Sequence, residues 1–228
     1  MRVEAVNGDT ITCKFPGAGV EMHCPLFCEK DEIGVLRGRI PEIKEKFTIV
    51  SRTFDLEKRE HYFTLDCDAV GLVEVGDTIE NLSGQAEILI ENCTFGIFRG
   101  TTRLQSRKKT VVRNCEFRNR DCSLLFTGDT TYWFESGPVE DFLVENCKFL
   151  NSNYGPRFNF TTEMEFTDEA KYYHKNVTVR DCYFDGDAVS CLWHVENFHF
   201  EHNRAEGTKT IYAKESKGVV ADADTIIK

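Results

Sequence analysis

One pattern of apolar and polar positions occurs four times between residues 88 and 184. Each copy has an alternating run of about four residues, then Asn or Asp, then Cys, then one variable residue and Phe. The copies are residues 88–95, 110–117, 142–149 and 177–184. Short alternating runs rich in β-branched residues are typical of strands with one buried face. Each copy therefore predicts a strand, a bend and a second, shorter strand.

The copies recur at a nearly regular period. The residues before the four cysteines are Asn92, Asn114, Asn146 and Asp181, and weaker copies continue the series at His202 and Ala223. The successive intervals are 22, 32, 35, 21 and 21 residues, which is a unit of about 21 residues with two insertions. A period in this range, built from strands, is typical of a solenoid.

A parallel β-helix explains the repeat better than a leucine-rich repeat does. The Leu-x-x-Leu-x-Leu pattern is absent, and the units contain a further strand-like segment, such as residues 123–126 and 210–213. We therefore expect an all-β chain in which residues 83–228 form a right-handed parallel β-helix with coils about 4.8 Å apart. Inward ladders of Asn, Cys and Phe are expected, with the Asn amides bonding neighbouring coils.

Residues 1–82 do not follow the repeat. They read as short antiparallel strands with turn signals at residues 7–9, 16–17 and 76–77. We expect a small β-barrel-like subdomain, joined to the second part near residues 81–84.

Ten cysteines are present, and four of them occupy the same point of the repeat. A disulfide framework does not require this regularity, so Cys93, Cys115, Cys147 and Cys182 are expected to be buried, reduced thiols. A weaker alternative is a metal site at His23, Cys24 and Cys28, which lacks a second Cys pair at zinc-binding spacing. We therefore expect no metal site. The sequence suggests no partner for Cys13, Cys67, Cys122 and Cys191.

The charge balance argues against nucleic acid as a partner. The chain has 28 Lys and Arg against 38 Asp and Glu, a net charge of −10, and no basic stretch longer than residues 107–109. Phosphate binding usually requires a basic stripe. No apolar run approaches the ~20 residues that would cross a bilayer, so a membrane partner is not expected, and the first residues lack the apolar stretch of a signal peptide.

Residues 124–137 carry the most specific motif, Leu-Leu-Phe-Thr-Gly-Asp-Thr-Thr-Tyr-Trp-Phe-Glu-Ser-Gly. Together with Glu-Asn-Leu-Ser at 80–83 and Phe-Arg-Gly at 98–100, it resembles glycoside hydrolase family 110, the bacterial α-1,3-galactosidases. The resemblance covers roughly residues 60–228. It implies a β-helix carrying small β-barrels, a secreted or periplasmic location, and inverting, exo-acting hydrolysis without metal or cofactor. The implied substrates are glycans ending in α-galactose, either blood-group-B-type or linear α-1,3-linked.

The chain departs from the family pattern in three ways. Family members are much longer, with further coils and another barrel on the N-terminal side. The Asn-Asn of the family's coil bend is Asn-Cys here. The segment before Glu163 is similar to a family strand that ends in Pro-Glu, but Thr162 stands where Pro is expected. We therefore expect the C-terminal portion of such an enzyme or a reduced relative.

Glycoside hydrolysis needs two carboxyl groups, one as acid and one as base or nucleophile. The candidates are Asp129, Glu135, Glu163, Glu165 and Asp187. We favour Asp129, because it follows a strand and a glycine and precedes an aromatic run that would favour a protonated carboxyl group. Glu135 and Glu163 are the next candidates. The alternatives are a turn-capping role for Asp129 and exposed structural charges for the two glutamates.

Sugar binding is expected from aromatic and arginine side chains outside the Phe ladder. Trp133, Tyr132, Trp193 and Tyr154 offer stacking faces for a pyranose ring. Arg99 and Arg157 offer hydrogen bonds to hydroxyl groups. The alternatives are core packing for the aromatics and surface ion pairs for the arginines.

Two other functions remain open. One is a non-catalytic carbohydrate-binding or structural β-helix. The other is a polysaccharide lyase, which needs clustered Asp for Ca²⁺ and a basic residue beside an acidic sugar. The net charge of −10 argues mildly against an acidic polymer as substrate. A homodimer is also considered, since the sequence does not fix the oligomeric state.

Overall fold

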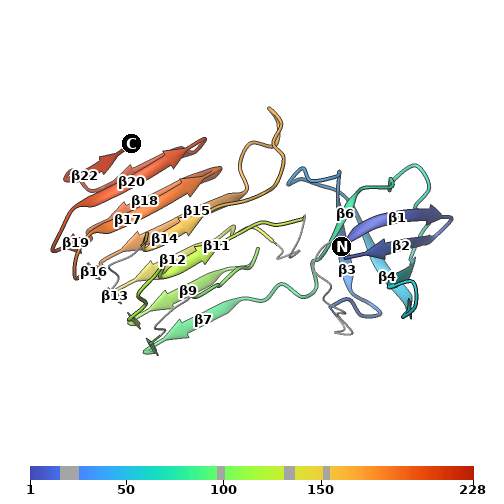
Figure 1. Ribbon diagram of the computed structural model, residues 1–228, viewed down its shortest axis with the longest axis horizontal. Helices are drawn as coiled ribbons and strands as arrows, with labels where there is room; N and C mark the ends of the chain where they lie inside the picture. Colours follow the sequence, from blue (N-terminus) through green and yellow to red (C-terminus); the bar gives the residue numbers. More distant parts are fainter. Residues whose placement is uncertain (16–25, 97–100, 131–136, 151–154) are drawn as a thin grey trace. The chain divides into compact units, whose positions relative to one another are not determined.

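The computed structural model describes residues 1–15, 26–96, 101–130, 137–150 and 155–228 (Figure 1). Every regular element in them is a strand. Nowhere in these ranges is there a helix long and apolar enough to cross a membrane. The chain divides into two compact units. The barrel unit contains Met1–Gln85, Glu163–Ala170, Asp129 and Thr130, and the three-sheet unit contains Ala86–Gly128, Gly137–Thr162 and Lys171–Lys228.

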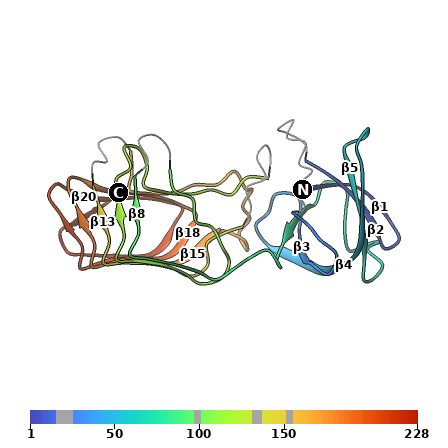
Figure 2. The same ribbon diagram turned by 90° about the horizontal axis from the view of Figure 1, so that it is seen from below.

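The barrel unit is a closed barrel of six antiparallel strands in the order β1-β2-β5-β4-β3-β6. The strands are β1 (Arg2–Asn7), β2 (Thr10–Lys14), β3 (Glu32–Leu36), β4 (Ile43–Asp55), β5 (Glu60–Leu65) and β6 (Thr78–Asn81), most of them visible in Figure 2. Alternate residues are buried, as in β5, so one face of each strand fills the interior. Its core includes Val3, Ile11, Ile33, Ile49 and Phe63. Closure leaves no sheet edge exposed.

The three-sheet unit consists of parallel sheets that the chain visits in turn. The first is β7 (Ile88–Glu91), β9 (Thr110–Arg113), β12 (Phe142–Glu145), β15 (His174–Arg180), β18 (Val195–Glu201) and β21 (Lys217–Ala221). The second is β8 (Thr94–Phe95), β10 (Glu116–Phe117), β13 (Lys148–Phe149), β16 (Tyr183–Phe184) and β19 (Arg204–Ala205). The third is β11 (Leu124–Phe126), β14 (Phe158–Phe160), β17 (Ala188–Trp193), β20 (Lys209–Lys214) and β22 (Thr225–Ile227). Several parallel sheets of this kind are compatible with a parallel β-helix.

Successive coils pair in register despite the two insertions. In the first sheet Glu91, Arg113, Glu145, Arg180 and Glu201 lie opposite one another. The first four of these are followed by Asn92, Asn114, Asn146 and Asp181, and the backbone N–H of each donates to a carbonyl oxygen of the next coil at 3.2 Å. The predicted register of these four residues is confirmed.

The expected inward ladder of Asn side chains is wrong. Asn92, Asn114, Asn146 and Asp181 have φ between 50° and 56°, and all four are exposed. A left-handed residue turns the chain sharply, and Asn and Asp tolerate this conformation better than most residues. The side chain then projects outward at the bend. The expected bond between coils is still present, because Asn146 Nδ2 donates to Asn114 Oδ1 at 2.6 Å.

The Phe ladder is confirmed. The rings of Phe95, Phe117, Phe149 and Phe184 stack with centroids 4.8, 5.0 and 4.9 Å apart and interplanar angles of 4°, 6° and 9°. They form part of one continuous core with the apolar residues of the other two sheets. Ring stacking at this spacing matches the spacing of paired strands, so each coil fixes the position of the next.

The cysteines of the repeat are free thiols, and three of the four are buried. Cys115, Cys147 and Cys182 each donate to the carbonyl oxygen two residues earlier, at 3.1–3.3 Å. Cys93 is exposed, contrary to expectation, because β7 and β8 lie at the edges of their sheets. In the next coil, the position equivalent to Cys182 is occupied by the buried residue Asn203. Its Oδ1 accepts a hydrogen bond from the Cys182 N–H at 2.9 Å.

The Phe ladder makes a prediction about stability. Replacing Phe149 by Ala removes a fully buried ring that stacks on both neighbours, so the free energy of unfolding should fall by about 3–5 kcal/mol. Phe95 is the matched control, since it is half-buried and stacks on one described neighbour. Its replacement by Ala should cost clearly less. Equal losses for the two variants in urea unfolding would show that the ladder does not stabilise the core.

Candidate active site

Asp129 and Glu163 follow neighbouring strands of the third sheet at equivalent positions. Phe126 of β11 lies opposite Phe160 of β14, and each carboxylate comes three residues later. The pairing continues past the strands, because Thr161 N–H donates to Phe126 O at 2.9 Å and Thr162 Oγ1 donates to Gly128 O at 3.2 Å. The register that stacks the coils therefore brings Asp129 and Glu163 to equivalent positions along the backbone.

The two carboxylates differ in their surroundings. Asp129 is only 8% exposed, whereas Glu163 is exposed to solvent. A buried and an exposed carboxyl group at equivalent positions have unequal access to water, which is the asymmetry that acid and base roles require. Both residues belong to the barrel unit.

Arg39 of the barrel holds the segment that begins at Glu163. Its guanidinium donates to the Glu163 carbonyl oxygen and forms an ion pair with Glu165 at 3.4 Å. Its own carbonyl accepts the Glu165 N–H at 3.0 Å. Three interactions from one residue therefore fix the backbone next to a candidate catalytic carboxylate.

Asp77 and Thr78 fix the turn that presents Arg39. Gly38 has φ of 57°, a conformation that favours glycine, and its N–H donates to Asp77 Oδ1 at 3.1 Å. Thr78 Oγ1 donates to the Gly38 carbonyl at 2.6 Å. Asp77 is 3% exposed and pairs with Lys44 at 2.6 Å, which neutralises its buried charge.

The sequence did not single out Arg39, Asp77 or Thr78 as functional residues. The available signal was local: a glycine between Arg37 and Arg39, and a Gly-Asp turn at residues 76–77. Nothing in either segment indicates a contact with residues more than 100 positions later.

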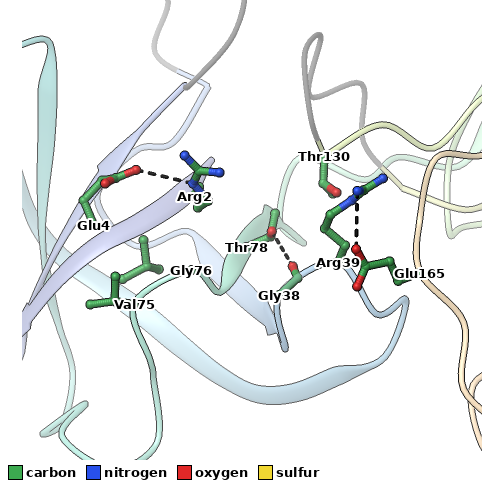
Figure 3. A pocket seen from close by; sticks show the side chains of 10 residues that line it. Arg2, Glu4, Gly38, Arg39, Val75, Gly76, Thr78, Thr130 and Glu165 are labelled. Carbon is green, nitrogen blue, oxygen red and sulfur yellow. Dashed lines mark hydrogen bonds and ion pairs between the residues drawn. The ribbon is translucent and has the colours of Figure 1, made fainter.

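A pocket of about 550 Å³ lies in the barrel unit beside these groups (Figure 3). Its lining is mostly polar and consists of Arg2, Val3, Glu4, Gly38, Arg39, Val75, Gly76, Thr78, Thr130 and Glu165. Figure 3 shows Arg39 directed toward Glu165 and Arg2 directed toward Glu4. Thr130 follows Asp129 directly, and Glu165 is two residues after Glu163. Two residues of the pocket lining are therefore close in sequence to the two candidate carboxylates.

Tyr173 and His174 support the strand ends from the three-sheet unit. Tyr173 packs so closely on Gly128 that a Cβ there would lie nearer to the ring than van der Waals contact allows. His174 is fully buried; its Nδ1 accepts from Val139 N–H at 3.2 Å, and its Nε2 lies 3.5 Å from Thr161 O. These contacts define the neutral Nε2–H tautomer, and burial lowers the pKa of His174 to about 3.

Trp193 lies at the end of β17, on the coil after β14. The Lys214 ammonium is 4.7 Å from its ring centroid, and the indole Nε1–H has no partner among the described residues. One face of the ring is therefore engaged by a cation. This is the same end of the sheet from which Asp129 and Glu163 depart.

The structure places Arg157 in the interior, where it is 1% exposed. Its Nε donates to Asp187 O at 3.1 Å, its Nη2 pairs with Asp185 at 3.4 Å, and desolvation by burial lowers its pKa. Asp187 is on the surface, where its Oδ1 accepts from the Thr208 N–H at 2.7 Å and from the Thr208 hydroxyl at 3.0 Å. These two bonds lower the pKa of Asp187.

Several predicted residues lie outside the described part of the chain. They are His23, Cys24, Arg99, Tyr132, Trp133, Glu135 and Tyr154. Within the described ranges, no group of three or more His, Cys, Asp or Glu side chains is arranged to hold a metal ion.

The described chain is all-β, and Asp129 and Glu163 follow neighbouring strands of its third sheet. Sequence comparison identifies relatives of the chain. No family model matches the chain. Alpha-1,3-galactosidase B of Bacteroides thetaiotaomicron is 32% identical over 134 residues, which is 55% of this chain and 22% of that protein. Alpha-1,3-galactosidase B of Akkermansia muciniphila is 25% identical over 95% of this chain and 28% of its own length. Alpha-1,3-galactosidase A of Bacteroides fragilis is 25% identical over 67% of this chain.

These matches confirm the resemblance to α-1,3-galactosidases, glycoside hydrolase family 110, that the motifs predicted. The chain spans about a quarter of the length of the relatives it matches. It is consistent with a partial or reduced relative of these enzymes.

Gly128 provides a test of the packing behind the site. Gly128→Ala forces a Cβ into the Tyr173 ring, and overpacking of this kind costs about 1–3 kcal/mol of unfolding free energy. The control is Gly96→Ala, since no atom lies within 4 Å of a Cβ at that position. Urea unfolding followed by circular dichroism should show a lower midpoint only for Gly128→Ala. A midpoint equal to that of the control would contradict the close packing.

His174 predicts how stability depends on pH. Its pKa is lowered to about 3 in the fold, so the unfolded chain binds a proton near pH 6.5 that the folded chain does not. The stabilisation is complete above pH 6.5 and is lost as the pH falls, by about 1.4 kcal/mol between pH 7.5 and 5.5. His61, lowered to about 4, acts in the same direction.

The variant His174→Asn isolates this contribution, because Asn keeps an acceptor for Val139 N–H and does not titrate. Its unfolding free energy should vary less between pH 7.5 and 5.5 than that of the unmodified chain. In the unmodified chain, NMR titration of the His174 imidazole should show no protonation at pH 5. Protonation above pH 5 would contradict the buried neutral form.

Proposed function

We propose that this chain is an exo-acting, inverting glycosidase that releases terminal α-1,3-linked galactose without a metal ion. The names of its relatives support the reaction class. The observation that carries the proposal is the register of β11 and β14, which aligns Asp129 and Glu163 at neighbouring strand ends. We also propose that residues 83–228 form a right-handed parallel β-helix and residues 1–82 a separate barrel domain.

The unequal exposure of the two carboxylates supports distinct roles. Asp129 suits the general acid that protonates the leaving oxygen, because burial favours a protonated carboxyl group. Glu163 suits the general base, because the water that it activates must reach it from solvent.

The spacing of the coils is compatible with inversion. Inverting enzymes hold the two carboxyl groups ~6.5–9.5 Å apart, so that a water molecule fits between one group and the sugar. Equivalent backbone positions on paired strands are ~4.8 Å apart, and the extra methylene group of the Glu163 side chain allows the two carboxyl groups to lie farther apart than that.

The remaining predicted residues complete the proposal. Glu135 is a further acidic residue in the same motif as Asp129. Trp193, at the matching end of β17, is proposed as a further sugar-binding residue, although its ring already contacts Lys214 and stacks against His194. Arg99, Tyr132, Trp133 and Tyr154 are proposed as sugar-binding residues on the strength of the sequence alone.

A second candidate is a carbohydrate-binding module without catalysis. The observation in its favour is length, since the chain spans about a quarter of each relative and the residues that complete an active site in those enzymes need not lie within it. Measured turnover separates the two functions.

The test is galactose release from α-1,3-galactobiose in the presence of EDTA. Asp129→Asn and Glu163→Gln should each lower kcat by about 10²–10⁴-fold and leave the melting temperature within a few degrees. The control is Glu169→Gln, an exposed acid in the same segment as Glu163. Full activity in Asp129→Asn would exclude it as a catalytic group, and absence of turnover in the unmodified chain on every α-galactoside would exclude the glycosidase function.

A further inference from the structure

Two buried polar atoms in the lining of the barrel pocket have no hydrogen-bond partner among the described residues. They are Arg39 Nε, which is a donor, and Thr130 Oγ1, which can donate and accept. Buried polar atoms are nearly always hydrogen-bonded, because an unsatisfied one costs about 1–3 kcal/mol. Two such atoms in the same pocket indicate that the pocket is built to receive a polar ligand.

The charges of the lining indicate that the ligand is neutral. Arg2 pairs with Glu4 and Arg39 pairs with Glu165, each at 3.4 Å, so the lining contains two positive and two negative groups. An anionic ligand would meet two carboxylates and a cationic ligand two guanidinium groups. A neutral ligand with many hydroxyl groups meets donors and acceptors without a net electrostatic penalty.

The dimensions and the apolar part of the lining suit a sugar. A volume of about 550 Å³ lies within the range of small-molecule sites. Val75 is 67% exposed and offers an aliphatic surface to the C–H face of a pyranose. Thr78, whose hydroxyl is engaged by Gly38, holds the base of the pocket rather than the ligand.

We propose that this pocket binds a neutral sugar unit of the glycan, next to the unit that is cleaved. The ligand would accept a hydrogen bond from Arg39 Nε and exchange one with Thr130 Oγ1. Binding of a neutral saccharide follows from the pocket alone, whereas its place beside the scissile bond rests on the proposed function. We place the bound sugar unit beside the scissile bond because two pocket residues are close in sequence to the proposed catalytic residues: Thr130 follows Asp129, and Glu165 lies two residues after Glu163.

Direct binding by calorimetry tests the proposal and needs no turnover. The Asp129→Asn protein, in which hydrolysis does not interfere, is titrated with α-1,3-galactobiose, with galactose and with digalacturonic acid, and the binding variants below are made in the same background. Galactobiose should bind more tightly than galactose, because it fills the pocket in addition to the galactose position. Digalacturonic acid should bind at least tenfold more weakly, because its carboxylates meet Glu4 and Glu165.

Variants of the two unpartnered atoms locate the site. Thr130→Val removes the hydroxyl with little change in volume, and Arg39→Lys removes Nε but keeps the charge. Each should weaken galactobiose binding by about tenfold, the value of one lost hydrogen bond to a sugar. Thr130→Ser keeps the hydroxyl and should bind as the Asp129→Asn protein itself does. Thr53→Val and Arg37→Lys, exposed barrel residues outside the pocket, are the matched controls.

Unchanged galactobiose affinity in both Thr130→Val and Arg39→Lys would overturn the proposal, as would tighter binding of digalacturonic acid than of galactobiose. Melting temperatures of all variants show whether the barrel is folded, and Thr130→Val, compared with Thr130→Ser, retains the test if Arg39→Lys unfolds. Galactobiose binding that depends on Thr130 but is followed by no hydrolysis would support the pocket and contradict the glycosidase function. Hydrolysis that does not depend on Thr130 or Arg39 would support the glycosidase function and contradict the binding role of the pocket.

Discussion

In-register parallel pairing between successive coils is the constraint on which the rest of the three-sheet unit depends. It brings equivalent residues to the spacing of paired strands, so Phe rings stack inside and left-handed Asn residues align at the bend outside. The same pairing continues past the ends of β11 and β14, where Asp129 and Glu163 follow at equivalent backbone positions. A shift by one residue would turn each strand's buried face outward and separate the two carboxylates.

Residues of the barrel restrain the segment that contains Glu163. Asp77 and Thr78 fix the Gly38 turn, the turn presents Arg39, and Arg39 binds both the backbone and the side chain of residues 163–165. A long loop would otherwise lose much of the positional precision that catalysis needs.

The repeat made the strands, their register and the Phe ladder predictable. Each copy contains the same pattern of apolar and polar residues, and the spacing of the copies shows which residues of successive coils pair. Side-chain direction at the bend was not predictable from the repeat, since it depends on the backbone conformation of Asn92 and its equivalents. The burial of Cys93 was misjudged because the pattern does not show which coil lies at a sheet edge. Arg39 was missed because its partners lie 124 and 126 residues away and belong to no repeat. Arg157 was proposed for sugar binding, yet the structure encloses it in the core, since charge alone does not reveal burial.

We have proposed that a buried Asp129 and an exposed Glu163 act as acid and base on opposite sides of one glycosidic bond. Proton NMR of the anomer first released from α-1,3-galactobiose tests it most directly, because two carboxyl groups with room for water between them invert the configuration. If the two residues act in this way, β-galactose should appear first and then mutarotate. First appearance of α-galactose would contradict it, since retention requires one carboxylate to attack the sugar itself.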